Sequence, residues 1–268
     1  MATDSTKESR IVNAELHIRL QERTAQLEAA NREVEAFAYS VSHDLRAPLR
    51  AIRGFSQVLM EEYAPQLPEE AQHYFQVIRD NALQMGELID ALLTFSRLGR
   101  QPLQRESMDM SELAWQAFLE VKPEEVKPEI EPRIDMVVRD LLVCQGDRVL
   151  IKQVLVNLLS NAIKYTRGRA TASIEVGIEL REPTDAAIYY VRDNGVGFDM
   201  RYVHNLFGAF QRLHSSDDYA GIGMGLATVR RIVHRHGGRV WAEGKVDAGA
   251  TFYFTLEPEA TALGAFVT

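Results

Sequence analysis

Several features are scarce or absent in this sequence, and each absence narrows what the protein can be. The only cysteine, Cys144, excludes an intrachain disulfide and a zinc site built from several cysteines, and it fits a reducing cytosol. No apolar run approaches the roughly 18 residues that a bilayer-spanning helix needs, and the first ten residues lack the apolar core of a signal peptide. The net charge of -8 argues against a general nucleic-acid binder. We therefore expect a cytoplasmic protein with no membrane span and no nucleic-acid partner.

A seven-residue repeat runs through the N-terminal part of the chain. Leu20, Leu27, Val34 and Val41 recur at this spacing, and charged or amide side chains fill most other positions. Such heptads are typical of a coiled coil. We expect a helix that begins near Ile11, after ten polar and disordered residues, and that associates with a second copy. A single amphipathic helix packed against its own chain would produce the same pattern.

The helical pattern continues through a histidine that is followed directly by a carboxylate, His43-Asp44. Apolar residues recur at three- and four-residue steps from Val34 to Leu59, and His43 points away from that face at about 100° per residue. Pro48 lacks the N–H that would bond to the carbonyl of Asp44, so we expect the helix to kink or loosen beside the histidine. The stretch predicts either an exposed, reactive imidazole or an ordinary surface histidine on a bundle helix.

A second long helix follows a loop with two prolines at residues 61–68. Its apolar stripe extends from Ala71 to Phe95 at helical spacing, and the helix should end near Leu98. Two amphipathic helices joined by a short loop form a hairpin that leaves one apolar face open. Two such hairpins would close that face as a dimeric four-helix bundle. Residues 99–102 break the pattern, and we place a domain boundary there.

Beyond residue 107 helices and strands are mixed, which predicts an α+β fold. Helices are expected over residues 110–119, from a cap at Asp147 to Tyr165, and from Gly225 to the glycine pair 237–238. Strands are expected at residues 134–138, 174–180, 187–191, 239–243 and 251–256. Residues 259–268 are interpreted as a tail.

The helix after Asp147 is apolar except for one polar stripe. Gln153, Asn157, Asn161 and Lys164 follow each other at steps of four, four and three residues, so they share a face. Burying amides and an ammonium without partners would cost on the order of several kcal/mol, so the stripe must face water or a polar ligand. Amide oxygens suit magnesium and lysine suits phosphate, which indicates a magnesium-bound polyphosphate. A stripe that simply faces solvent is the alternative.

Two glycine-rich turns would let a ligand approach the backbone closely. Asp193-Asn-Gly-Val-Gly197 follows a predicted strand, and a buried aspartate there could accept a hydrogen bond from an adenine amino group. Asn-Gly is also a frequent signature of a simple turn. Gly221-Ile-Gly-Met-Gly225 opens a helix, whose free N–H groups favour phosphate. It matches neither the phosphate-loop motif nor a dinucleotide fingerprint, so alone it does not define a site.

These motifs occur together in the order found in one family. Over residues 33–257 the chain resembles the histidine protein kinases of two-component signalling. Its sequence at residues 210–215 and 239–244 is similar to that of the phytochrome-like group. The resemblance rests on a histidine box at 37–49, an asparagine box at 153–166, glycine boxes at 193–197 and 221–225, a phenylalanine box at 207–212 and a last glycine motif at 249–252.

The resemblance implies an arrangement of domains and partners. The implied domains are a linker or coiled-coil signalling helix at 1–32, a dimerisation and histidine-phosphotransfer hairpin at 33–102, a Bergerat-type ATP-binding α/β sandwich at 107–258 and a tail at 259–268. The implied partners are a second copy joined through residues 11–98, a response-regulator receiver domain, and an upstream sensor domain or sensory protein. A hinge near residues 99–102 would let the ATP-binding domain reach the histidine.

The resemblance also implies roles for single residues. His43 would accept the γ-phosphoryl group of ATP, Asp44 would fix the tautomer of its imidazole, and Asn161 would be the Mg²⁺ ligand. Lys164 would contact phosphate, and Asp193 would bind the adenine amino group. The implied ATP site further includes Asn157, Tyr165, Gly195, Gly197, Phe207, Arg212, Gly221, Gly223, Gly225 and Leu226, with a lid at residues 214–219.

The chain departs from the family pattern at two positions. Many relatives have Thr or Asn four residues after the histidine, where this chain has Ala47, so we expect weak or absent phosphatase activity toward the receiver. Ala250 stands where the last motif often has a second glycine, with a small expected effect.

Two other functions compete with the kinase. A gyrase-like ATPase would not need His43-Asp44 on an exposed helix, and a non-catalytic dimerisation scaffold would not need the asparagine stripe or the glycine turns.

Overall fold

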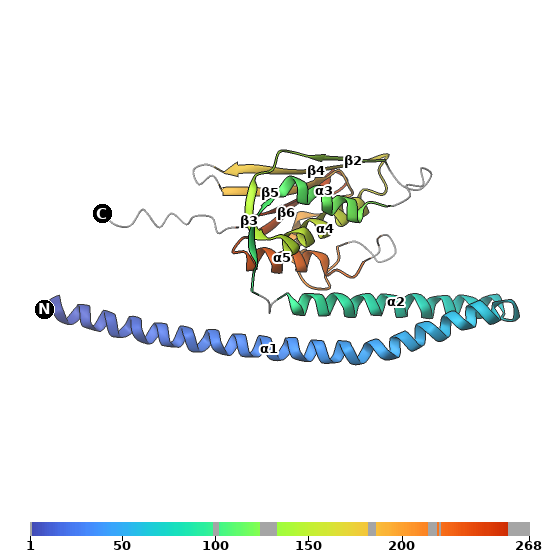
Figure 1. The fold of residues 1–268 in the computed structure, drawn as a ribbon, viewed down its shortest axis with the longest axis horizontal. Helices are drawn as coiled ribbons and strands as arrows, with labels where there is room; N and C mark the ends of the chain where they lie inside the picture. Colours follow the sequence, from blue (N-terminus) through green and yellow to red (C-terminus); the bar gives the residue numbers. More distant parts are fainter. Residues whose placement is uncertain are drawn as a thin grey trace. The chain divides into compact units, whose positions relative to one another are not determined.

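The computed structural model divides the chain into two compact units, Met1–Arg100 (unit 1) and Gln101–Thr268 (unit 2). It describes residues 2–98, 102–123, 133–181, 186–213, 219 and 221–256, and in the first 40 residues it describes side chains at only a few positions. The other parts of the backbone are the thin grey traces in Figure 1.

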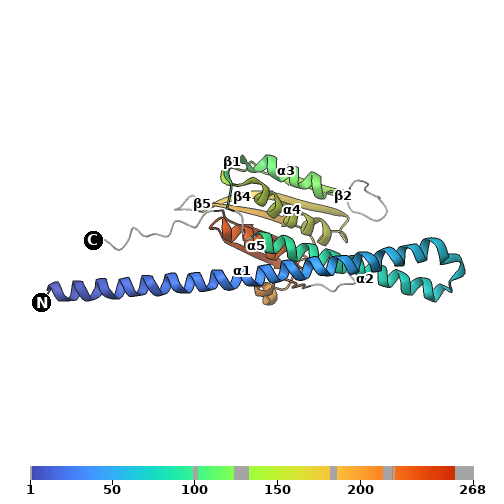
Figure 2. The same cartoon turned by 60° about the horizontal axis from the view of Figure 1, so that its bottom comes forward.

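Unit 1 is a hairpin of two long helices. Helix α1 spans Ala2–Tyr63, a 3-10 helix η1 spans Ala64–Gln66, and α2 spans Glu69–Arg97. In both Figure 1 and Figure 2, α2 runs back alongside the C-terminal part of α1. The buried apolar side chains that join the two helices are Leu49, Ala82, Ile89 and Leu93. The predicted hairpin is confirmed.

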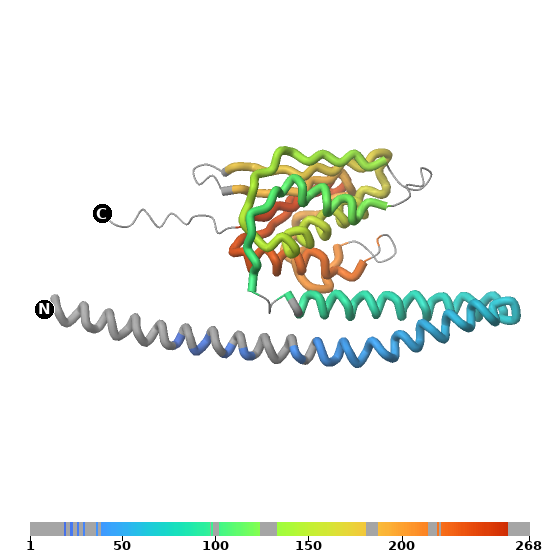
Figure 3. The backbone as a smooth tube through the Cα atoms, in the orientation of Figure 1, coloured from blue at the N-terminus to red at the C-terminus, as the bar shows by residue number. Residues whose placement is uncertain are grey.

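Helix α1 differs from the prediction at its start and at its proline. It begins at Ala2 and not near Ile11, because residues 2–47 contain neither glycine nor proline and nothing in them ends a helix. It also continues through Pro48 without a break, and in Figure 3 this part of the tube curves gently and shows no sharp kink. The heptad side chains of Leu20, Leu27 and Val34 lie outside the described residues.

One hairpin leaves a broad apolar face uncovered. Phe55 is 72% exposed, and Leu45 and Ile52 are exposed by 42% and 45%, although they belong to the apolar stripe of α1. Leu49, from the same stripe, is buried against α2. This is the open face that the sequence predicts for a single hairpin.

Unit 2 is built on a five-stranded sheet. Its strands are β2 (Arg133–Val138), β4 (Thr171–Arg181), β5 (Ala186–Asp193), β7 (Gly249–Phe254) and β6 (Val240–Lys245), in that spatial order. Strands β2 and β4 are parallel, and every other neighbouring pair is antiparallel. All five correspond to predicted strands.

Three helices cover one face of this sheet, as the two views in Figures 1 and 2 show. They are α3 (Met110–Val121), α4 (Arg148–Tyr165) and α5 (Gly225–Arg235), and α4 packs between the other two. Alternate strand residues are buried in the core, among them Ile174, Val176, Val191, Phe252 and Phe254. A 3-10 helix, η2 (Met200–Asn205), follows β5. The α/β sandwich predicted for this half of the chain is confirmed.

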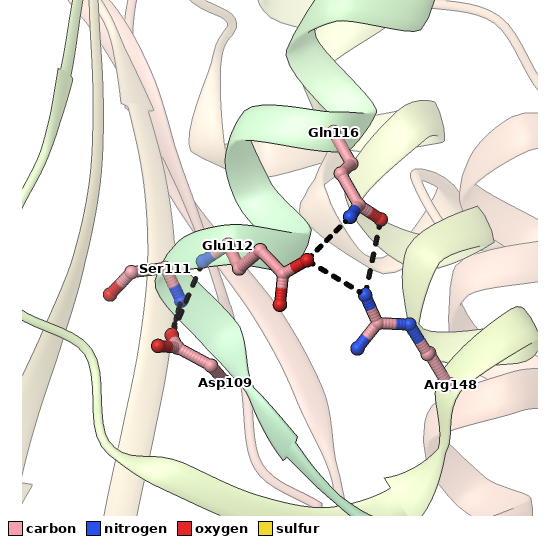
Figure 4. A network of polar contacts seen from close by, with 5 residues as sticks. All are labelled: Asp109, Ser111, Glu112, Gln116 and Arg148. Atoms are coloured by element: carbon pink, nitrogen blue, oxygen red, sulfur yellow. Dashed lines mark hydrogen bonds and ion pairs between the residues drawn. The ribbon is translucent and has the colours of Figure 1, made fainter.

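Polar side chains fix the start of α3 and join it to α4, as Figure 4 shows. Asp109 caps α3 by accepting hydrogen bonds from the N–H groups of Ser111 (2.8 Å) and Glu112 (3.2 Å). Arg148, the first residue of α4, donates to Glu112 (3.4 Å) and to Gln116 (3.3 Å), and Gln116 donates to Glu112 (2.8 Å). The cap and this cluster set the register of α3 against α4.

The start of α4 is held by a cap and by a buried histidine. The predicted cap is confirmed, because Asp147 accepts a hydrogen bond from the N–H of Leu150 (3.2 Å). The N–H of Asp147 lies 3.0 Å from Nε2 of His236, whose Nδ1 lies 2.8 Å from the carbonyl oxygen of Ile232. Since a carbonyl only accepts, Nδ1 must donate, and Nε2 must be the unprotonated acceptor. His236 is therefore neutral and joins the end of α5 to the start of α4.

A small second sheet was not predicted. Strands β1 (Arg105–Asp109) and β3 (Val143–Asp147) pair antiparallel, with Met108 opposite Cys144. The sequence of β1, Arg-Glu-Ser-Met-Asp, is mostly polar and shows no alternation of apolar residues. Its pairing depends on β3, which lies more than 30 residues further along the chain, and a local pattern cannot report such a partner.

Candidate active site

The His43 side chain in unit 1 is open to solvent, as predicted. Its side chain is 73% exposed and that of Asp44 is 76% exposed, whereas the preceding Ser42 is buried. Nδ1 of His43 lies 3.3 Å from Oδ1 of Asp44. A carboxylate can only accept, so this contact selects the tautomer with the proton on Nδ1 and the lone pair on Nε2. In that tautomer the lone pair of Nε2 can act as a nucleophile.

Unit 2 contains a pocket with about 550 Å³ of empty space, its open mouth included. The ends of α4 and β5, the start of α5 and strand β7 all contribute to its wall. It is lined by Tyr165, Asp193, Gly197, Phe198, Asn205, Leu206, Gln211, Arg212, Leu213, Leu226, Ala250 and Phe252. Most of these side chains are apolar, and few charged groups are available to orient a ligand. A mainly apolar pocket with a few placed polar groups is typical of a small-molecule site.

Asp193 is a buried carboxylate of the pocket wall. It is 7% exposed, and its Oδ1 accepts a hydrogen bond from the N–H of Gly195 at 2.8 Å. Burial raises the pKa of Asp193 to about 6, although hydrogen bonds from the backbone of Gly195 and Ala250 and the charge of Arg169 oppose the rise. A carboxylate kept in such a position at neutral pH is available to accept a hydrogen bond from a ligand.

The turn after Asp193 requires its glycines. A Cβ on Gly195 would lie 2.6 Å from the carbonyl oxygen of Tyr165, and a Cβ on Gly197, whose φ is +60°, would lie 2.0 Å from that of Lys245. The N–H of Val196 donates to the same Tyr165 carbonyl (3.1 Å). The turn is therefore pressed against the end of α4, and no larger residue fits there.

The polar stripe of α4 approaches the second glycine turn. The amide NH₂ of Asn157 donates to the carbonyl of Gln153 (2.8 Å), which turns its oxygen toward Gly225, where an added Cβ would lie 3.0 Å away. A Cβ on Gly221 would lie 3.3 Å from Nζ of Lys164. The structure thus brings the stripe and the turn together, whereas the sequence alone left the stripe open as a solvent-facing surface.

Lys164 and Arg212 place two positive charges near the pocket. Nζ of Lys164 donates to the hydroxyl of Tyr165 (3.0 Å), and Arg212 donates to the carbonyl of Tyr219 (2.5 Å). Burial, and then the charges of Arg212 and Arg167, lower the pKa of Lys164 to about 8. Two nearby cations suit a polyanionic group such as a polyphosphate.

Five of the predicted ATP-site residues line the pocket: Tyr165, Asp193, Gly197, Arg212 and Leu226. Other predicted residues are not part of its lining, although several border it: Asn157, Asn161, Lys164, Gly195, Phe207, Gly221, Gly223 and Gly225. A Cβ on Gly223 would lie 2.7 Å from the carbonyl oxygen of Gln211, so the second glycine box packs on the phenylalanine box. Residues 214–218 of the predicted lid lie outside the described residues.

The pocket also contains residues that were not predicted as part of the site. Phe198, Asn205, Leu206 and Leu213 lie outside the motifs, whereas Gln211, Ala250 and Phe252 lie within the phenylalanine box and the last glycine motif. Phe198 directly follows the first glycine box, and Asn205 and Leu206 precede the phenylalanine box, so adjacency to a motif was the available signal. Phe252 belongs to the last glycine motif at 249–252, but no role in the site was predicted for its side chain.

The donor set that could hold Mg²⁺ consists of amide oxygens. Within the described parts of the chain, His, Cys, Asp and Glu side chains do not gather in groups of three or more. Asn161 is half-buried on α4, one turn from Asn157 and from Lys164. An amide oxygen is a suitable hard ligand for a magnesium ion that keeps several waters and is shared with phosphates. The residues present therefore fit the implied ion.

Two family models match the chain, and they match the two units in turn. The model described as "His Kinase A (phospho-acceptor) domain" matches residues 33–101, and that described as "Histidine kinase-, DNA gyrase B-, and HSP90-like ATPase" matches residues 146–260. The fold and the motifs thus define a phospho-acceptor hairpin followed by an ATPase sandwich.

Three relatives are similar to most of the chain. The chain is 39% identical to "Cyanobacterial phytochrome B" of Nostoc sp., over 87% of this chain and 30% of that protein. It is 34% identical to "Phytochrome-like protein Cph1" of Synechocystis sp., over 92% of this chain and 32% of that protein. It is 35% identical to "Methanogenesis regulatory histidine kinase FilI" of Methanothrix harundinacea, over 88% of this chain and 26% of that protein. The chain therefore spans about a third or less of the length of these relatives.

A solved structure agrees with these relatives. The structure described as "Crystal structure of ShkA full-length in complex with AMPPNP" has a TM-score of 0.60 and 26% identity, covering 84% of this chain and 46% of that one. The chain belongs to the histidine kinase family, and its sequence resembles that of the phytochrome-like group. Among the described residues, every helix is too short or too polar to cross a membrane.

Proposed function

We propose that this chain uses ATP to phosphorylate itself on His43 and then passes the phosphoryl group to an aspartate of a response-regulator receiver domain. The observation that carries this proposal is the exposed His43-Asp44 pair on one unit together with a pocket around a buried carboxylate on the other. This chain, a member of the histidine kinase family, thus has both a candidate phosphoryl acceptor and a candidate nucleotide site. Neither feature alone would distinguish a kinase from an ATPase.

The transfer step follows from the tautomer of His43. Its Nε2 lone pair attacks the γ-phosphorus of ATP in line with the leaving oxygen, so an N–P bond forms while the bond to the β–γ bridging oxygen breaks and ADP departs. The imidazole becomes positively charged, and Asp44 stabilises that charge and receives the Nδ1 proton. Positioning and charge neutralisation supply most of the catalysis in such a transfer.

The residues of unit 2 bind and orient the nucleotide in this proposal. Asp193 accepts a hydrogen bond from the adenine amino group, while Tyr165 and Leu226 contact the base. Lys164 and Arg212 face the phosphates, with the amides of the turn at 221–225 behind them. Asn161, supported by Asn157, would hold Mg²⁺, which neutralises phosphate charge when bound.

The proposal includes assembly and placement. The open apolar face of α1, with Phe55 72% exposed, is suited to a second hairpin, so residues 11–98 would form a homodimeric four-helix bundle. The implied input is an upstream sensor domain or sensory partner, and the implied location is the cytoplasm. The proposal includes no nucleic-acid partner and no direct membrane span.

Labelling with γ-³²P-ATP and magnesium tests the reaction. We expect label on the protein that is stable in alkali and lost in acid, as phosphohistidine is, and we expect none in His43→Gln. His73→Gln, which changes another exposed helical histidine, should label like the wild type. Free phosphate without labelled protein would instead support a gyrase-like ATPase, and neither product would support a scaffold. Label retained in His43→Gln would contradict the assignment of the acceptor.

A further inference from the structure

Arg169 lies in the turn after α4. Within the described part of the chain, the hydrogen bonds of its guanidinium go to main-chain carbonyl groups. Its Nε donates to the carbonyl of Asn194 (2.9 Å), and one terminal nitrogen donates to the carbonyls of Gly195 and Asp247, both at 2.8 Å. The first two carbonyls belong to the turn that follows Asp193, and the third belongs to the turn between β6 and β7. One guanidinium therefore joins two turns that lie more than 50 residues apart in the sequence.

We infer that Arg169 is a positioning residue that sets the place of the Asp193 carboxylate and thereby the preference of the pocket for adenine. This inference rests on the proposed ATP-binding function of the same pocket. Arg169 does not line the pocket, so it acts through the turn and not by touching the nucleotide.

The surrounding contacts show why this turn needs an external support. Its backbone bonds run outward to other segments: the N–H of Val196 donates to the Tyr165 carbonyl (3.1 Å), and the Val196 carbonyl accepts from the N–H of Asp247 (2.7 Å). Gly197 has a φ of +60°, and glycine gives a turn little stiffness of its own. Arg169 is held in place in its turn, because its own N–H donates to the carbonyl of Thr166 (2.9 Å) just after α4. The carbonyls that Arg169 binds are thus held in a fixed position relative to α4, the helix that carries Asn161 and Lys164.

The forked shape of the guanidinium is the property that lets Arg169 hold both turns. Nε and the terminal nitrogen reach carbonyls on two sides, which a lysine ammonium, a single point on a flexible stem, cannot do at once. The charge has a second effect, since Arg169 opposes the rise in the pKa of Asp193 that burial causes. Arg169→Lys keeps the charge and removes the fork, so it separates geometry from charge.

Binding of ATP and GTP analogues to the full chain, measured by calorimetry, tests the inference. For Arg169→Lys we expect affinity for AMPPNP to fall about tenfold or more, the loss of roughly one charge-assisted hydrogen bond, with a smaller fall for GMPPNP, so that discrimination between adenine and guanine decreases. Arg133→Lys, an exposed arginine that pairs only with Asp135 in the described contacts, should leave both affinities unchanged. Arg169→Gln should lose as much discrimination as Arg169→Lys if the fork is what matters.

Hydrogen exchange gives a readout that does not depend on nucleotide. In Arg169→Lys we expect the amides of Gly195, Val196 and Asp247 to exchange faster, while Leu158 in the middle of α4 keeps its protection. Unchanged discrimination, or equal loss of protection at Leu158, would overturn the inference while leaving the proposed function intact. Wild-type protein that binds no adenine nucleotide would overturn both.

Discussion

Replacing Asp193 by asparagine should stabilise unit 2 at neutral pH and at the same time weaken adenine binding. The carboxyl is 7% exposed, and burial raises its pKa from 3.8 to about 6. Between these two values the folded protein holds a proton that the unfolded chain has released. Its stability therefore decreases as pH rises through this window, and the full cost is present above about pH 6.

The size of the effect follows from that difference. A rise of about two pKa units corresponds to about 3 kcal/mol, because one unit is worth about 1.4 kcal/mol. Asparagine removes the buried charge but also weakens the bonds that Asp193 accepts from the backbone of Gly195 and Ala250, at about 0.5–1 kcal/mol each. We expect Asp193→Asn to raise the free energy of unfolding by about 1–2 kcal/mol at pH 8 and to leave it unchanged or lower at pH 4.5.

Tryptophan fluorescence during urea unfolding measures this change selectively. Both tryptophans, Trp115 and Trp241, belong to unit 2, so the signal reports that unit and not the hairpin. Asp199→Asn is the matched control with the opposite sign. Bonding to Arg201 lowers the pKa of Asp199, so that carboxylate stabilises the fold above its unfolded pKa, and its loss should destabilise unit 2 at pH 8. If Asp193→Asn is no more stable than the wild type at pH 8, the carboxylate is not paying a burial cost and our account of it is wrong.

Four further predictions follow from the structure. Gly197→Ala should destabilise unit 2 by about 2 kcal/mol or more, because φ is +60° and the methyl group meets a carbonyl oxygen, whereas Gly168→Ala, with open space around it, should be neutral in the same urea assay. Burial lowers the pKa of His236, so unit 2 should lose stability as pH falls below about 6.5, and His236→Gln should lessen that loss between pH 7.5 and 5. Affinity for ADP, measured by calorimetry, should fall between pH 7 and 9 as Lys164 loses its proton, and Lys164→Arg should remove the fall. Ala47→Thr should increase dephosphorylation of a phosphorylated receiver domain, and an unchanged rate would show that the alanine is not what limits it.

Local patterns were sufficient for the elements that carry the site. The cap at Asp147, the end of α4 at Tyr165 and the start of α5 at Gly225 were all predicted at the residues where they occur. Each is governed by chemistry within one turn of the chain, either a side chain that binds free N–H groups or a glycine that relaxes the backbone. A buried aspartate at position 193 was one of two interpretations of that turn, and Asp193 is 7% exposed.

Contacts between segments that are distant in the sequence could not be predicted from local patterns. Arg169 is a single arginine in a polar turn. Its positioning role depends on three carbonyl groups that the fold brings close to it. The same holds for His236, which pairs with the N–H of Asp147 some 90 residues earlier in the chain, and for strand β1. The apolar wall at Phe198 and Phe252 was missed because a residue that packs the core and one that lines a pocket have the same local pattern.

The uncovered face of the hairpin has a consequence for how the protein is made. The hairpin precedes unit 2, Gln101–Thr268, in the chain, so a ribosome makes α1 and α2 first and adds the 168 residues of unit 2 afterwards. At about 5–20 residues per second, that interval lasts on the order of 10 to 30 seconds. In a hairpin without a partner, Phe55, Ile52 and Leu45 are exposed. Neighbouring ribosomes on one message hold identical hairpins close together during this time, which favours pairing of chains before their ATPase units have been completed.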